Sequence, residues 1–268
     1  MSISNNKNTC KILVVLSLVI MITVNALANI LPINDLGTGE ISDSYPNLFA
    51  PDGLTFAIWG LIYILLAAFA AYQTGFLSKN KEVFESTWLR RVGFLFVLSS
   101  MANTIWIFAW HYKIIELSLI MMLIILASLI RIILILKRQN LSVKDNYLIR
   151  LPFSVYFGWI TVATIANVTT QLVDWNWNGF GISEQALTII VLAVGVLIGS
   201  TTILRNKDIA YGLVLVWAFT GILIKHLSPS GFQGEYTGIL VSVIISLVAF
   251  VAAILVVLVK KAKNRARK

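Results

Sequence analysis

Long apolar runs recur along the chain and are separated by short polar or basic segments. We place them at residues 12–31, 54–76, 92–111, 114–136, 151–172, 186–204, 209–227 and 237–259. Each run is close to the roughly 20 residues that a helix needs to cross a bilayer. A helix also satisfies its own backbone N–H and C=O groups, which lipid cannot do. The pattern therefore predicts an all-α, polytopic membrane helix bundle with about eight transmembrane helices.

Composition agrees with this prediction, and the charges suggest an orientation. Hydrophobic residues make up 58% of the 268 positions and charged residues only 12%, whereas soluble domains carry about 25% charged residues. With the N-terminus in the cytoplasm, all of the Lys and Arg residues except Lys113, Lys225 and Arg131 fall on the cytoplasmic side, as the positive-inside rule requires. Arg131 can snorkel from its helix to the same side. We expect a multi-pass protein with both termini in the cytoplasm, in a prokaryotic plasma membrane because no organelle-targeting signal is apparent.

Several other features narrow the range of functions. The basic tail at 260–268 is typical of an anchor on anionic lipid, and it lacks stacking aromatic residues, so nucleic acid is not expected as a partner. Cys10 is the only cysteine, which excludes an internal disulfide and a cysteine metal site. His111 and His226 are isolated near membrane faces, and neither a metal site nor a catalytic residue is predicted. The first run contains Ala26-Leu-Ala28, which resembles the small-residue cleavage site of a signal peptide. The run continues to Leu31, which is long for a signal peptide, so we expect this segment to be retained.

Tryptophan and buried amides are concentrated in the first two thirds of the chain. Of the eight Trp residues only Trp217 follows residue 180. We therefore predict a five-helix bundle at 1–172 that carries the site, three additional transmembrane helices at 173–259 that serve as scaffold, and the tail. Gly195 and Gly199 form a GxxxG motif, which favours close helix packing. As an alternative, the same motif could form the interface of a homodimer.

Three of the predicted helices each carry a stripe of aromatic rings with polar atoms. The stripes follow helical spacing and consist of Phe56, Trp59 and Tyr63; Asn103, Trp106 and Trp110; and Tyr156, Trp159, Ala163 and Asn167. A Trp or Asn side chain that faced lipid would leave a polar group unpaired, so the stripes should face one another. They could pack as a solid core tied by Asn hydrogen bonds, or they could line an aromatic cavity for a flat, mostly apolar ligand.

These motifs resemble the TspO/MBR family, the tryptophan-rich sensory proteins related to the mitochondrial translocator protein. The resemblance covers about 1–172 and rests on a proline before Trp-x-x-x-Tyr, on Asn-x-x-Trp followed by aromatics, and on Tyr-x-x-Trp with Ala and Asn four and eight residues later. In this chain those positions are Pro51, Trp59, Tyr63, Asn103, Trp106, Phe108, Trp110, Tyr156, Trp159, Ala163 and Asn167. The chain departs from the family at Leu54, Ala57 and Val155, and its last three helices go beyond the usual five-helix bundle.

The resemblance implies an integral membrane sensor or binding protein for a hydrophobic planar ligand, such as a tetrapyrrole or a sterol-like molecule. No cofactor is required, and porphyrin or haem is the candidate bound molecule. The predicted ligand-binding residues are Pro51, Phe56, Trp59, Tyr63, Asn103, Trp106, Trp110, Tyr156, Trp159, Ala163 and Asn167. Trp59 and Tyr63 would line one wall of an outward-opening pocket, and residues 51–53 would shape the loop that covers it.

Three alternatives stay open. A carrier of a small amphipathic solute would usually show repeated halves, and no internal repeat is apparent. A scaffold for other membrane proteins would bind no specific ligand. An enzyme acting on a bound tetrapyrrole, for example by light-driven oxidation, is suggested by the resemblance alone, so enzymatic activity is not predicted.

Overall fold

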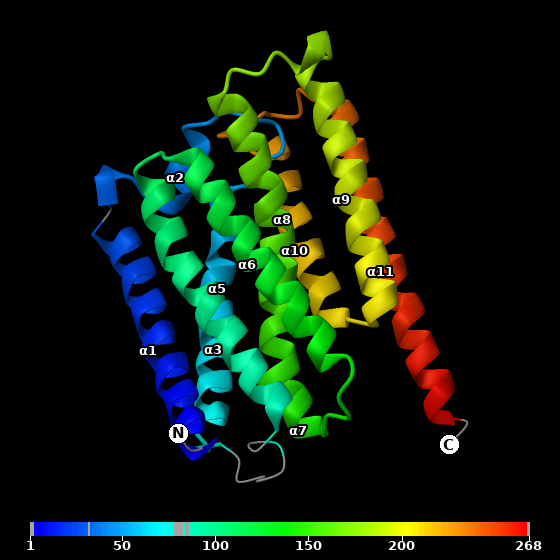
Figure 1. The fold of residues 1–268 in the computed structure, drawn as a ribbon. Coiled ribbons are helices and arrows are strands. Elements are labelled where there is room, and N and C mark those ends of the chain that lie inside the picture. Colours follow the sequence, from blue (N-terminus) through cyan, green and yellow to red (C-terminus); the bar gives the residue numbers. More distant parts are fainter. Residues whose placement is uncertain (1–2, 32, 78–82, 84–85, 267–268) are drawn as a thin grey trace. The chain divides into compact units, whose positions relative to one another are not determined.

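The computed structural model describes residues 3–31, 33–77, 83 and 86–266 (Figure 1). Lys79 and Lys81, which were assigned to a cytoplasmic loop, and the last two residues of the predicted tail lie outside this part. Within it every regular element is a helix. Eight helices are long and apolar enough to span a membrane, at Asn8–Ile30, Gly53–Gln73, Thr87–His111, Ile115–Leu136, Val143–Asp174, Glu184–Asn206, Ile209–Leu227 and Thr237–Asn264. The predicted all-helical bundle with eight spans is confirmed.

The helices follow one another in a simple order. The α-helices are α1 (Ile3–Ile30), α2 (Thr38–Asp43), α3 (Ile58–Gln73), α5 (Thr87–His111), α6 (Ile115–Leu136), α7 (Val143–Asp145), α8 (Leu151–Asp174), α9 (Glu184–Asn206), α10 (Ile209–Leu227) and α11 (Thr237–Ala266). Short 3-10 turns lie at η1 (Ile33–Asp35), η2 (Gly53–Ala57) and η4 (Gly179–Gly181). A π-helical turn, η3 (Asn146–Arg150), joins α7 to α8.

Capping side chains set several helix starts that the apolar pattern did not locate. Ser86 accepts a hydrogen bond from Leu89 N, so α5 begins at Thr87 and not at 92. Ser142 caps α7 in the same way, and the fifth span therefore begins before the predicted 151. Such caps satisfy backbone N–H groups that the first helical turn leaves without a partner. At the other end of the chain, α11 continues to Ala266, so the basic tail prolongs the last helix.

The chain forms two compact units, which are described separately below. The first comprises Met1–Ile41 and Ile58–Ile160, and the second comprises Ser42–Ala57 and Thr161–Lys268. The loop before α3 is thus shared between them, and so is α8. The division into 1–172 and 173–259 stays a prediction, and the compact units cut the chain at different places.

The first unit contains α1, α3, α5, α6 and the N-terminal part of α8. Helix α5 packs against α6 and α1, and α1 also packs against α3. Part of its core is a triad of fully buried phenylalanines, Phe69, Phe96 and Phe153, from α3, α5 and α8. Their ring centroids lie 4.7 to 6.0 Å apart in edge-on contacts. These three helices therefore meet along an aromatic seam.

The second unit is built on α9, α10 and α11, which pack against one another. The GxxxG motif lies within this packing. A Cβ atom at Gly199 would collide with Leu215 and lie 2.6 Å from Phe250, while one at Gly195 would lie 3.2 Å from Phe219. The glycines thus let α9 approach α10 and α11 closely. Packing within the chain accounts for the motif, and the homodimer stays a prediction.

Candidate functional site

Trp59, on the first turn of α3, lies at the centre of a group of contacting rings. Its ring centroid is 5.6 Å from Tyr63, 5.9 Å from Trp106, 5.9 Å from Tyr156 and 6.2 Å from Trp159. These five residues come from α3, α5 and α8 and all belong to the first unit. We call them the aromatic cluster. The structure thus brings together rings from all three stripes singled out in the sequence.

The geometry of the aromatic cluster follows from helical spacing. Trp59 and Tyr63 are one turn apart and stack with an interplanar angle of 23°, and Trp106 stacks in the same way on Trp110, with centroids 6.0 Å apart. Such stacked and edge-on distances are those of favourable aromatic contacts. The rings contact one another directly, whereas the sequence-based hypothesis has them enclose a hollow. A planar ligand would therefore have to separate rings in order to enter.

Burial divides the aromatic cluster into two parts. Trp106, Tyr156 and Trp159 are at most 4% exposed. Trp59 and Tyr63, both on α3, are only partly buried. The α3 pair is therefore the part of the aromatic cluster that can move with the least disturbance of packing.

The indole N–H of Trp106 is a donor without a partner. Its Nε1 atom is fully buried and has no hydrogen bond to any part of the chain that the structure describes. An unsatisfied buried donor of this kind costs about 1–3 kcal/mol. One turn later on the same helix, Trp110 Nε1 donates to the backbone oxygen of Thr38 at 3.0 Å. Trp106 therefore presents an N–H group that an acceptor on a bound molecule could satisfy.

The side-chain polar atoms of Asn103 are already hydrogen-bonded within the protein. Its Oδ1 atom accepts a 2.8 Å hydrogen bond from Asn25 Nδ2, and its Nδ2 atom donates to the Tyr156 hydroxyl at 3.4 Å. All three side chains are buried. This chain of hydrogen bonds connects α1, α5 and α8. Asn25 is not among the residues predicted for the site, although an amide within an apolar run was a signal that could have identified it.

The end of α5 holds the first part of the loop between α1 and α3. In addition to the bond from Trp110, the two ring nitrogens of His111 lie 3.1 Å from Thr38 Oγ1 and 3.0 Å from Ile33 O. Asn34 Nδ2 donates to the backbone oxygen of His111. His111 is fully buried, and both of its nitrogens are engaged. Its polar atoms therefore fix residues 33–38 on α5.

Four of the predicted site residues belong to the second unit, not to the first unit with the aromatic cluster. Pro51 and Phe56 precede α3 and belong to the second unit, and Ala163 and Asn167 lie on the part of α8 that also belongs to it. Pro51 and Asn167 are buried, whereas Phe56 and Ala163 are partly exposed. A role for these four residues in ligand binding stays a prediction.

Residues 42–57 are held by α10, a contact that the sequence pattern did not indicate. Asp52 N donates to Gly221 O at 3.1 Å, and Trp217 Nε1 donates to Thr55 O at 3.0 Å. A Cβ atom at Gly221 would collide with Thr55, so the two backbones can approach only because residue 221 is glycine.

The end of α10 makes two further contacts to the same segment. His226 Nε2 lies 2.9 Å from Leu48 O, and Lys225 Nζ forms a 2.7 Å ion pair with Asp43. Helix α10 therefore positions the segment that leads into α3, which is a larger role than the scaffold expected of it.

Comparison with known proteins identifies the family. A family model described as TSPO-like protein matches residues 11–260. No curated protein and no solved structure matches the chain. The family match extends well beyond residue 172 and includes α9 and α10. It therefore covers nearly the whole multi-pass membrane protein, together with the aromatic cluster. This chain is a member of the TSPO-like protein family.

Proposed function

We propose that this protein is an integral membrane sensor or binding protein whose aromatic cluster binds a hydrophobic, planar ligand of the tetrapyrrole or sterol-like class. The observation that carries the proposal is the buried N–H of Trp106, which has no acceptor in the described part of the chain. It lies among contacting rings from three helices. A flat ligand with an oxygen or nitrogen acceptor would supply both the stacking surface and the missing hydrogen bond.

Because the rings contact one another directly, a ligand can bind only if two rings separate and each contacts the ligand instead. Trp59 and Tyr63 are partly exposed and share one helix, so their movement would open the face of Trp106. Trp159 and Tyr156 are buried and would stay in place as the opposite wall. Tyr156 is also fixed by its hydrogen bond from Asn103. In this proposal Asn103 supports the wall, and Trp106 contacts the ligand.

The aromatic cluster suits a tetrapyrrole held by stacking more than one held through its metal. Its five members are Trp and Tyr residues, with no His, Cys or Met among them. His111, the nearest histidine along α5, has both ring nitrogens engaged with Thr38 and Ile33. Protoporphyrin and haem should therefore bind with affinities that agree within about threefold, a difference of less than 1 kcal/mol.

Titration of purified protein with protoporphyrin, followed by the Soret band, tests the proposal. Trp106→Phe keeps a ring but removes the N–H donor, so the affinity should fall about 3–10-fold, the value of one hydrogen bond. Trp175→Phe is the matched control, because Trp175 is 60% exposed and lies outside the aromatic cluster. Equal binding by the parent protein, Trp106→Phe and Trp106→Ala would refute this site.

Further measurements separate the alternative functions. Mass spectrometry of the natively purified protein identifies any apolar molecule that travels with it, and a scaffold would carry none in a defined ratio. Ligand flux into liposomes would indicate a carrier. Ligand turnover under light but not in darkness would indicate an enzyme.

A further inference from the structure

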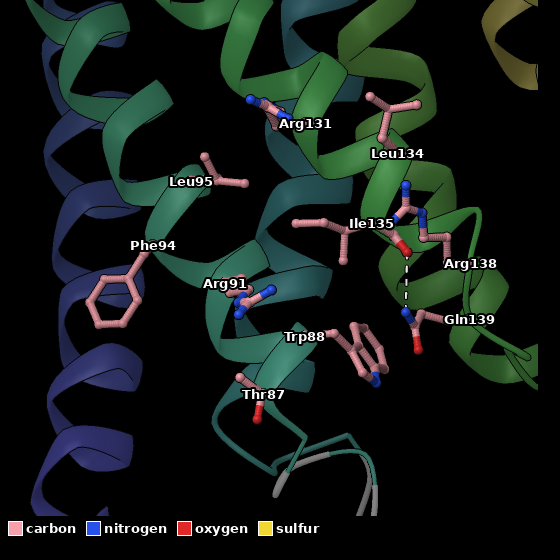
Figure 2. A pocket seen from close by; sticks show the side chains of 10 residues that line it. All are labelled: Thr87, Trp88, Arg91, Phe94, Leu95, Arg131, Leu134, Ile135, Arg138 and Gln139. Atoms are coloured by element: carbon pink, nitrogen blue, oxygen red, sulfur yellow. Dashed lines mark hydrogen bonds between the residues drawn. The ribbon is translucent and has the colours of Figure 1, made fainter.

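A groove lies between the start of α5 and the end of α6, away from the aromatic cluster. Its volume is about 990 Å³, which is at the upper end of the range for small-molecule sites. Figure 2 shows the side chains from both helices around it. The lining residues are Thr87, Trp88, Arg91, Phe94, Leu95, Arg131, Leu134, Ile135, Arg138 and Gln139.

Three of the lining residues are arginines: Arg91 on α5, Arg131 on α6 and Arg138 in the turn that follows α6. Arg91, Arg131 and Arg138 are all exposed. Within the part of the chain that the structure describes, none of their guanidinium groups has a hydrogen bond or an ion pair. An arginine stays charged in a protein. The groove therefore carries three positive charges without a counter-charge from the described residues.

The arginines also lie at different depths. Arg131 lies on α6, about one and a half turns before its end, whereas Arg138 lies two residues after Leu136, in the turn that follows the helix. Arg131 lies inside the span Ile115–Leu136, where an uncompensated charge is costly. The groove therefore favours an anion that reaches from the membrane surface down into the span.

Apolar side chains accompany the charges. Phe94 and Leu134 are more than 40% exposed, and Leu95 and Ile135 are partly exposed. Trp88 lies at the start of α5 beside Thr87 (Figure 2). A free phosphate would leave this apolar surface uncovered, whereas the acyl chains of a lipid would cover it.

We propose that this groove binds an anionic phospholipid, with its headgroup phosphate held by Arg91, Arg131 and Arg138 and its acyl chains lying along the apolar lining. Guanidinium groups bind phosphate oxygens with two parallel hydrogen bonds. Basic pockets between transmembrane helices are suited to such headgroups. The lipid would fill the groove and fix α5, which carries Trp106, against α6.

Native mass spectrometry of the full chain in mixed micelles of phosphatidylglycerol and phosphatidylcholine tests this site. The triple variant R91Q/R131Q/R138Q should bind phosphatidylglycerol about tenfold more weakly than the parent, because it loses charge-assisted hydrogen bonds. The matched control K144Q/R205Q/K207Q removes three exposed basic side chains that do not line the groove and should keep the parent's affinity. An equal loss in both variants, or no loss in the first, would overturn the proposal.

Two further arms complete the experiment. Arg131→Lys keeps the charge but cannot form the two parallel hydrogen bonds of a guanidinium group, so it should bind phosphatidylglycerol several-fold more weakly. This single variant tests the proposal if the triple variant does not fold. Phosphatidylcholine should bind more weakly than phosphatidylglycerol in the parent. Displacement of the lipid by millimolar glycerol 3-phosphate would assign the groove to a soluble phosphate compound and would contradict the lipid proposal.

Discussion

Among single residues, the buried polar groups of the first unit differ in what satisfies them. Asn103 bonds to Asn25 and Tyr156, and Trp110 and His111 bond to Thr38 in the loop between α1 and α3. The Trp106 N–H has no such partner among the described residues. The sequence alone cannot distinguish these roles. It shows which Trp and Asn residues share a helix face, but not which group each side chain bonds to. Trp106 combines burial, ring contacts and an open donor.

The bond between Asn25 and Asn103 should be measurable as a coupling. We expect a double-mutant cycle of Asn25→Ala and Asn103→Ala to give a coupling energy of about 0.6–1.7 kcal/mol, as for hydrogen bonds between membrane helices. Steric trapping in bicelles would supply the unfolding free energies. Thr104→Ala is the control partner, because its hydroxyl donates to Ser100 O on its own helix. Additive effects of Asn25→Ala and Asn103→Ala would contradict the hydrogen-bonded pair.

Among the helices, α10 has a role that its apolar sequence does not indicate, which is to hold residues 42–57. The apolar runs predict where the eight spans lie, because the thickness of the bilayer sets their length. They do not predict which loop a helix holds, since this depends on a glycine opposite Thr55 and on single donors such as Trp217. The three stripes were predictable for the same reason as the spans, namely that helical spacing is visible in sequence. The anchoring of residues 42–57 on α10 was not.

Gly221 should therefore be intolerant of a side chain. We expect Gly221→Ala to destabilise the protein by about 1–3 kcal/mol, because the new methyl group would overlap Thr55. Gly60→Ala is the matched control. It lies on α3 with open space around it, and helix propensity should make it neutral or stabilising by up to about 1 kcal/mol. Thermal unfolding in detergent compares the two, and equal stability would show that η2 does not pack on α10.

In the whole molecule, the loop between α1 and α3 is divided between the two compact units. Residues 33–38 are fixed by His111 and Trp110 in the first unit, whereas residues 42–57 are fixed by α10 in the second. From the sequence this loop was expected only to cover a pocket. Its division could not be predicted, because nothing in a Pro- and Gly-rich stretch reveals which helix will supply the hydrogen bonds.

The two parts of the loop should therefore respond to different mutations. Trp217→Phe removes the bond to Thr55 O and should speed amide exchange in residues 52–57 by about 3–10-fold, the value of one hydrogen bond. His111→Ala should do the same for residues 33–38. Hydrogen–deuterium exchange of the full chain measures both segments at once. If either variant loosened both segments equally, the loop would behave as one body and the division would be wrong.

The most direct test of ligand binding at the aromatic cluster is the indole N–H spectrum of ¹⁵N-Trp-labelled protein during titration with protoporphyrin. Trp106 gives a signal that is assigned by its loss in Trp106→Phe. We predict that this signal moves downfield as its N–H gains an acceptor, that the Trp59 signal shifts with it, and that exposed Trp175 stays unchanged. A Trp106 signal that does not move at saturating ligand would contradict the account.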